Sequence, residues 1–222
     1  THCISSAASD VYKRQGLRKS LRAEAIALEN KLPVVRLVES GGANLMHVGE
    51  VFIDGGRGFA NQARMSARGI PQVCVMHGHS TAGGAYLPGM SDYVIMVRGR
   101  AKAFLAGPPL LKAATGEIAT DEELGGAEMH CSISGVAEYL AEDDADGIRI
   151  ARDILARLPW NDRLPMRAVK TWKEPRYPVE QLAGVVPTDF RQPYDMRELL
   201  ARLIDDSDFL EFKPLYGSST VC

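Results

Sequence analysis

The sequence predicts an α/β layered domain, and three of its features support this fold class. Short apolar runs of strand length alternate with stretches whose apolar residues recur at the three- and four-residue spacing of a helix. Two of the strand-like runs end at a glycine pair, Gly41-Gly42 and Gly83-Gly84. Because open α/β sheets bind ligands at the carboxyl ends of their strands, both pairs are candidates for a binding site.

The first predicted elements lead to the first glycine pair. Residues 1–15 show neither the apolar core of a signal peptide nor an amphipathic pattern and resemble translated adapter sequence, so we interpret them as a non-native tail. Residues 17–32 have the spacing of an amphipathic helix, which Pro33 ends. A strand is predicted at residues 34–38, directly before Gly41-Gly42.

A second unit of the same kind leads to Gly83-Gly84. A glycine-containing stretch at residues 46–58 precedes a predicted helix at residues 59–67, and a buried strand is predicted at residues 73–76. The later predicted elements are helices at residues 85–87, 110–114, 148–158 and 196–204 and strands at residues 93–97 and 101–105. Residues 159–187 are rich in proline and charge, which indicates a linker or a wrapped arm.

Composition excludes several classes of function. The chain has 222 residues, 45% of them hydrophobic, which is enough to bury a large core. The net charge of −2 and the scattered lysines and arginines do not suit a nucleic-acid surface, and no run approaches the roughly 18 apolar residues of a membrane span. The four cysteines lack zinc-ligand or disulfide-framework spacing, and the acidic run at residues 142–146 suits a solvated helix start. We therefore expect no nucleic-acid or membrane partner, no bound metal and a reducing compartment.

The glycine pair at Gly83-Gly84 has the features of a backbone oxyanion hole. Glycine lets a ligand approach the backbone, and a helix start presents N–H groups with no partner inside the helix. Small residues surround this pair, including Ala82 and Ala85. Other pairs, such as Gly55-Gly56, do not follow a buried strand, so position distinguishes the candidate.

A serine nucleophile is a competing interpretation of the same segment. Residues 78–82 lack only the final glycine of the G-x-S-x-G elbow of serine hydrolases, with Ser80 as the nucleophile. His130 would be the base, and Asp92 or Asp121 the residue that orients it. His77 and His79 are better explained by packing or a hydrogen bond than by a metal, and Tyr86 by core filling.

Four segments carry a resemblance to a known family. They are residues 39–45 (ESGGANL), 81–86 (TAGGAY), 107–117 (GPPLLKAATGE) and 124–131 (LGGAEMHC). In this order they resemble the carboxyltransferase (β) subunit of biotin-dependent acyl-CoA carboxylases, and within that group the methylcrotonyl-CoA and geranyl-CoA branch. The resemblance covers residues 16–222.

The resemblance implies a crotonase-like (ClpP/crotonase) spiral domain at residues 16–185, followed at residues 186–222 by the start of a truncated second one. It implies transfer of a carboxyl group from carboxybiotin to an acyl-CoA such as 3-methylcrotonyl-CoA, within leucine catabolism. Biotin would be carried by a partner biotin carboxylase/biotin carrier (α) subunit, and the β subunits would form a homo-oligomer. The implied location is the bacterial cytoplasm, or the mitochondrial matrix in a eukaryote.

The resemblance also assigns site residues. Gly83 and Gly84 would form one oxyanion hole, flanked by Ala82 and Ala85. The further substrate-binding residues would be Gly41, Gly42 and Ala43, which shape the pocket, and Gly107, Pro108 and Pro109, which form a rigid wall. Because the family's active site uses the second domain of another subunit, we expect the chain to be inactive alone. A serine hydrolase using Ser80 and a non-catalytic acyl-CoA-binding module remain alternatives.

Overall fold

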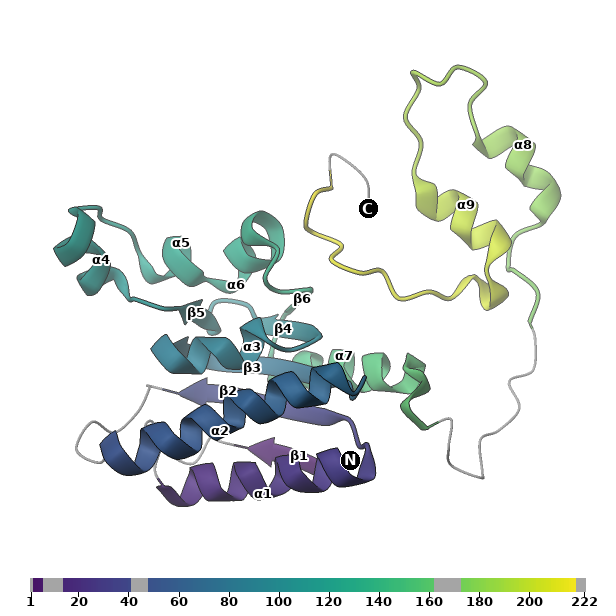
Figure 1. Ribbon diagram of the computed structural model, residues 1–222. Coiled ribbons are helices and arrows are strands. Elements are labelled where there is room, and N and C mark those ends of the chain that lie inside the picture. The colour runs from purple at the N-terminus through teal and green to yellow at the C-terminus, as the bar shows by residue number, and fades with distance from the viewer. Residues whose placement is uncertain (1, 6–13, 41–47, 162–172, 219–222) are drawn as a thin grey trace. The chain divides into compact units, whose positions relative to one another are not determined.

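The computed structural model describes residues 2–5, 14–40, 48–161 and 173–218 (Figure 1). The chain forms two compact units, which are described separately here. The first contains Thr1–Arg163 together with Phe212–Cys222, and the second contains Leu164–Glu211. The predicted domain boundary after Val185 stays a prediction.

A parallel sheet forms the centre of the first unit. Among the described residues it has six strands, in the order β1-β2-β3-β4-β6, with β5 paired to β3. The bounds are β1 His2–Ser5, β2 Val34–Ser40, β3 Gln72–Thr81, β4 Tyr93–Val97, β5 Lys102–Phe104 and β6 Tyr139–Ala141. Because every pairing is parallel, the carboxyl ends of the strands lie along one edge of the sheet.

Helices cover both faces of this sheet. In Figure 1, α1 (Arg14–Asn30) and α2 (Val48–Ala67) lie together in front of it, and α7 (Asp144–Arg157) lies behind it. α1 packs against α2, and α7 contacts β3, β4 and β6. With both faces covered, β3 and β4 are buried along continuous apolar runs, in which Val75 and Ile95 are fully inaccessible.

Short helices connect and follow these strands. In the first unit they are the 3-10 helix η2 (Ala82–Ala85), α3 (Tyr86–Gly89), α4 (Pro108–Thr115), α5 (Asp121–Gly125), α6 (Ala127–Met129), the π-helix η3 (His130–Ser134) and η4 (Pro159–Asn161). The second unit contains η5 (Val179–Gln181), α8 (Leu182–Val185), α9 (Met196–Leu203) and η6 (Asp205–Ser207). Residues 159–187, predicted as a linker or arm, therefore include short helices.

The predicted α/β class is confirmed, and the strand predicted at residues 93–97 coincides with β4. The acidic run also begins a helix as expected, since the Asp143 side chain accepts a hydrogen bond from the Asp146 N–H at the start of α7. Within the part of the chain that is described, no helix is both long and apolar enough to cross a membrane.

Two sequence predictions about element boundaries are wrong. α2 begins at Val48, not at Phe59, because its inward face continues through Val51, Gln62 and Met65 despite the glycines between them. Tertiary packing of this face outweighs the low helix propensity of glycine. His2–Ser5, excluded as part of a tail, forms β1 and pairs with Val34–Leu37, since its backbone completes the edge of the sheet.

Candidate functional site

The chain turns sharply where β3 ends, at the carboxyl edge of the sheet. Thr81 is still extended, with φ −109° and ψ 155°, but Ala82 adopts φ +50°, a left-handed conformation that alanine rarely takes. Such a conformation costs on the order of 1–3 kcal/mol and is concentrated at ligand-binding sites. The turn places Gly83 in the first turn of η2, where helix N–H groups have no partner within the helix.

The two glycines of the pair have different surroundings. Gly83 is exposed, and a Cβ atom built on it would meet only the Phe59 Cζ atom, at 3.9 Å. Gly84 is buried, and a Cβ atom on it would lie 2.9 Å from the Ser80 Oγ atom. The structure therefore leaves the backbone open to a ligand at Gly83, whereas Gly84 is required by close packing.

Two aromatic side chains lie beside the open glycine. The Phe59 ring of α2 and the Tyr86 ring of α3 have centroids 5.5 Å apart at a tilt of 56°. Tyr86 is half exposed, so the prediction that it fills the core is wrong. Its position directly after η2 directs the ring outward, where the two rings provide an apolar surface next to Gly83. Sequence reasoning missed Phe59, because its nearness to Gly83 depends on how α2 crosses the sheet.

Three strand ends meet at this turn. Ser40 at the end of β2 pairs with Ser80, and Phe104 at the end of β5 pairs with Thr81. Gly107 follows β5 as the N-cap of α4, and Pro108 and Pro109 form the first turn of that helix. Gly107 lies near the Phe104 ring, since a Cβ atom built on Gly107 would be 3.4 Å from the Phe104 Cε2 atom.

The structure thus brings the segment after β5 to the same edge as Gly83, with Ala82 and Ala85 inside η2. Gly41, Gly42 and Ala43 lie outside the described residues, although β2 ends at Ser40 beside the turn. The binding roles of all these residues stay predictions.

The geometry does not support the serine-hydrolase alternative. Ser80 is fully buried, and its Oγ atom has no hydrogen-bond partner among the described residues. Both ring nitrogens of His130 are engaged elsewhere, with Ala103 O at 2.7 Å and Ser134 Oγ at 2.8 Å. A serine nucleophile needs an adjacent base, and here neither the base nor access for a substrate is in place.

His77 and His79 have structural partners. His77 Nδ1 lies 2.7 Å from Asp144 Oδ1, and Arg100 donates a 2.7 Å hydrogen bond to the other oxygen of that carboxylate. These contacts hold the pKa of Asp144 below its ordinary value, with the His77 hydrogen bond as the largest cause. His79 contacts Phe104 edge to face. The predicted packing or hydrogen-bonding role of the two histidines is confirmed.

The thiols belong to the core. Cys74 and Cys131 are free and buried, and burial raises the pKa of each thiol to about 12, so both remain protonated at neutral pH. Within the described ranges, no three or more histidine, cysteine, aspartate and glutamate side chains gather as a potential metal site.

An exposed glycine on a strained turn, at the edge where parallel strands end, is a candidate oxyanion site in an α/β domain of the crotonase-like class. The sequence profile of the carboxyl transferase domain family matches residues 2–222, so the chain belongs to this family.

Several relatives refine this assignment. The chain is 58% identical over 205 residues to a probable biotin-dependent acyl-coenzyme A carboxylase β2 subunit of Mycobacterium tuberculosis, covering 92% of the chain and 38% of that protein. It is 51% identical over 209 residues to the mitochondrial methylcrotonoyl-CoA carboxylase β chain of Dictyostelium discoideum, covering 93% of the chain and 35% of that protein.

Among solved structures, the β subunit of geranyl-CoA carboxylase from P. aeruginosa is 63% identical and superimposes with a TM-score of 0.65, covering 90% of the chain and 37% of that subunit. The chain thus spans less than two fifths of the length of these relatives.

Proposed function

We propose that the chain supplies part of a carboxyltransferase that moves a carboxyl group from carboxybiotin to an acyl-CoA. The observation that carries this proposal is the turn after β3, where strained Ala82 presents exposed Gly83. The relatives support the reaction class, since they are described as biotin-dependent acyl-CoA or methylcrotonoyl-CoA carboxylase subunits.

The role of Gly83 follows from the charge that this reaction develops. Removing a proton from an acyl thioester places negative charge on the thioester oxygen. A preorganised N–H donor aimed at that oxygen stabilises the transition state, and removing one such donor typically raises the barrier by about 3 kcal/mol. We assign this role to the Gly83 backbone, with Gly84 holding the turn in place.

Biotin, carried by a partner α subunit, would supply the carboxyl group and then accept the substrate proton. The residues present fit this arrangement, because a Cβ atom at Gly83 would meet a single side chain, at 3.9 Å, and space for a ligand remains. Neither a serine nucleophile nor a histidine base is required from this chain.

The acyl group would lie against the aromatic rings. Phe59 and Tyr86 present apolar surface next to Gly83, which suits a branched, unsaturated acyl chain. The names of the relatives contain methylcrotonoyl-CoA and geranyl-CoA, and both acyl groups are of this kind. We therefore infer a substrate such as 3-methylcrotonyl-CoA.

We also infer a homo-oligomer of β subunits that acts with the α subunit. Several relatives are described as β subunits or β chains of such carboxylases. The bacterial cytoplasm is the inferred location, supported by the identity of 63% to the P. aeruginosa protein.

The experiment measures carboxyl transfer by the complete gene product that carries this sequence, together with its biotin-bearing partner. Labelled bicarbonate, ATP and 3-methylcrotonyl-CoA should give acid-stable label in the acyl-CoA, and avidin should abolish it. Binding of the acyl-CoA with no label incorporated would indicate a binding module instead. Ester hydrolysis that is lost in Ser80→Ala would indicate a hydrolase, whereas unchanged transfer in that variant supports the proposal.

A further inference from the structure

The strained turn after β3 depends on the strands that hold its first residues in place. A left-handed alanine such as Ala82 persists only where the surrounding structure fixes its conformation. The two residues before it, Ser80 and Thr81, pair in parallel with Ala103 and Phe104 of β5. Since β2 also pairs with Ser80, β2 and β5 support the end of β3 from its two sides.

β5 needs support of its own, because it has only three residues and a strand of this length forms few ladder hydrogen bonds. The segment around α5 provides part of this support. Lys102 of β5 forms an antiparallel bridge with Gly126, and its Nζ atom lies 3.0 Å from Glu122 Oε1. Gly125 packs so closely that a Cβ atom built on it would collide with the Ala103 carbonyl oxygen.

His130 contacts the middle residue of β5. Its Nε2 atom lies 2.7 Å from the Ala103 carbonyl oxygen, and its Nδ1 atom lies 2.8 Å from Ser134 Oγ. Because a carbonyl oxygen can only accept, Nε2 carries a proton and donates it to Ala103. In the neutral ring, Nδ1 then accepts from the Ser134 hydroxyl. The ring therefore connects β5 to the helix η3.

The local structure of η3 sets the orientation of this ring. η3 is a π-helix, a rare form that is frequent at functional sites. It begins at His130 and ends at Ser134, before Gly135, which has a φ of +67°. The Ser134 hydroxyl also accepts a 3.3 Å hydrogen bond from the Val136 N–H. The partner of Nδ1 is thus itself held by the backbone, and the ring is preorganised toward β5.

We propose that His130 is a positioning residue for carboxyl transfer. Its Nε2–H holds Ala103 of β5, and β5 holds the end of β3 at which the turn to Gly83 begins. This inference rests on the proposed function, in which the Gly83 backbone stabilises the charge that develops on the substrate. His130 acts through the backbone and not by contact with the substrate. A displacement of about 1 Å at a reacting centre can lower a rate about a hundredfold, so a small movement of β5 is sufficient.

The test compares three substitutions of His130 in the complete gene product that carries this sequence. His130→Ala removes both ring nitrogens. His130→Gln places its amide nitrogen near the position of Nε2 and keeps a donor for Ala103, whereas the shorter His130→Asn reaches only the position of Nδ1. The control is Ile154→Val, which removes a methyl group from a buried side chain of α7 and lowers stability elsewhere in the first unit. Circular dichroism checks that each variant is folded.

Two measurements are made on each variant. Steady-state carboxyl transfer to 3-methylcrotonyl-CoA, with the biotin-bearing partner present, gives kcat and KM. Amide hydrogen exchange of residues 79–87 reports on the turn whether or not transfer occurs. This peptide contains the residues of β3 that pair with β5, and the Tyr86 N–H that donates to the Gly83 carbonyl oxygen.

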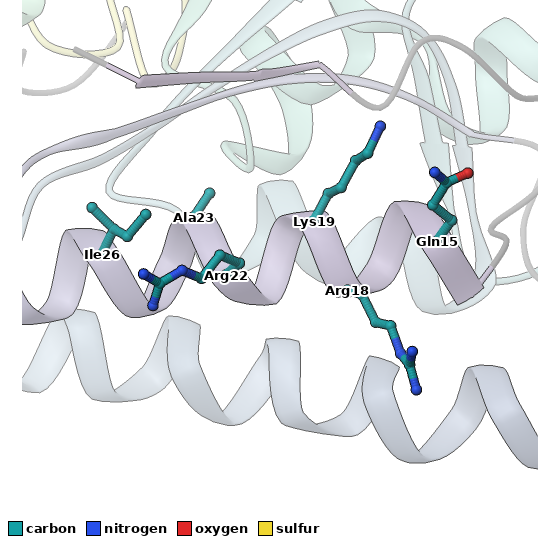
Figure 2. A pocket seen from close by; sticks show the side chains of 6 residues that line it. All are labelled: Gln15, Arg18, Lys19, Arg22, Ala23 and Ile26. Atoms are coloured by element: carbon teal, nitrogen blue, oxygen red, sulfur yellow. The ribbon is translucent and has the colours of Figure 1, made fainter.

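α1 provides the reference for exchange within the same molecule. It packs against α2 and β1, and Figure 2 shows its side chains, including Gln15, Arg18 and Lys19, around a pocket on its surface. Loss of the His130 contact should leave exchange in α1 unchanged, whereas general destabilisation of the first unit should increase exchange in α1 and in the turn together.

We expect His130→Ala and His130→Asn to lower kcat at least about tenfold while KM for the acyl-CoA stays within about threefold, because the turn loses its support but the rest of the substrate site is kept. Exchange of residues 79–87 should become at least about tenfold faster in both. His130→Gln and Ile154→Val should stay within about threefold of the wild type in kcat.

A wild-type kcat in folded His130→Ala would overturn the proposal, as would a lower kcat with unchanged exchange in the turn. Equal losses in His130→Gln and His130→Asn would also overturn it, and this pair decides the question even where His130→Ala does not fold. Faster exchange in His130→Asn but not in His130→Gln, in a protein whose wild type transfers no carboxyl group, would retain the support of the turn by His130 and contradict the proposed function.

Discussion

Three consecutive residues have different roles in the turn after β3. Ala82 adopts the left-handed backbone conformation. Gly83 leaves space for a ligand beside the backbone, and Gly84 packs against Ser80. The sequence singles out the glycine pair as a candidate site, since the pair follows a buried strand. It did not separate the two roles, because they depend on which side of the turn faces solvent and which faces Ser80.

Alanine substitutions at the two glycines should therefore differ in their effect on stability. Gly84→Ala should lower the free energy of unfolding by about 1–3 kcal/mol, because its Cβ atom would crowd the Ser80 Oγ atom at 2.9 Å. Gly83→Ala should have little effect, since its Cβ atom enters open space. Urea unfolding measures both.

The double variant Gly84→Ala/Ser80→Ala tests the cause directly. Removing the Ser80 hydroxyl should recover most of the stability lost in Gly84→Ala. Equal losses in Gly83→Ala and Gly84→Ala, or no recovery in the double variant, would show that the packing account of this turn is wrong.

Glu138 provides a residue-scale prediction about pH. It is buried, accepts a 2.5 Å hydrogen bond from the Val94 N–H and pairs with Lys213 at 3.3 Å. Burial raises the pKa of Glu138 above its ordinary value of 4.5, despite these contacts. The folded state therefore binds the proton more tightly than the unfolded state, so this group adds stability as pH falls through the raised pKa toward 4.5.

Glu138→Gln should remove this part of the pH dependence while keeping an acceptor for Val94. In the wild type, Glu138 should raise the free energy of unfolding at pH 5 relative to pH 8. We expect this contribution to be absent from the variant. Urea unfolding at several pH values checks this. An identical pH dependence in the two proteins would contradict the assignment.

At the scale of elements, one buried ion pair joins the helices in front of the sheet to the strands. Arg36 of β2 donates hydrogen bonds to Glu24 of α1 at 3.3 Å and to Gln72 of β3 at 3.1 Å. Asn61 of α2 donates to the second oxygen of Glu24 at 3.2 Å. The network thus fixes α1 and α2 against β2 and β3. Sequence patterns place charges on α1 but do not show this pairing, which requires residues 12 to 37 positions apart to meet.

Arg36→Met should therefore destabilise the protein by about 3–5 kcal/mol, because Glu24 would be left as an unpaired buried charge. Glu24→Met/Arg36→Met should lose less than the sum of the single variants, since no charge is then left alone. A double-mutant cycle by urea unfolding gives the coupling. Additive losses would contradict the role given to this pair.

The helix and strand predictions succeeded where the pattern was strong and local. The uninterrupted apolar run of β4 predicted its bounds correctly, and proline ended α1 close to the expected position. α2 was predicted too short because its glycines resemble loop residues, and only its packed inward face keeps the first half helical. β1 was missed because its composition carries no strand signal and its partner strand defines it.

On the scale of the whole molecule, the residues of the proposed site lie within one of the two compact units. The turn after β3 and the aromatic pair of Phe59 and Tyr86 both belong to the first compact unit. The chain spans 38% of the M. tuberculosis relative and 37% of the P. aeruginosa subunit. The proposed carboxyl transfer is therefore assigned to the complete gene product that carries this sequence.

The central claim is that the exposed Gly83 backbone stabilises the charge formed during transfer. The most direct measurement is the rate of carboxyl transfer to 3-methylcrotonyl-CoA by the complete gene product and its partner, compared between wild type and Gly83→Val. We predict at least about a hundredfold lower kcat with coenzyme A affinity retained, because the valine side chain occupies the approach to the Gly83 amide. Transfer at the wild-type rate by Gly83→Val would contradict the claim.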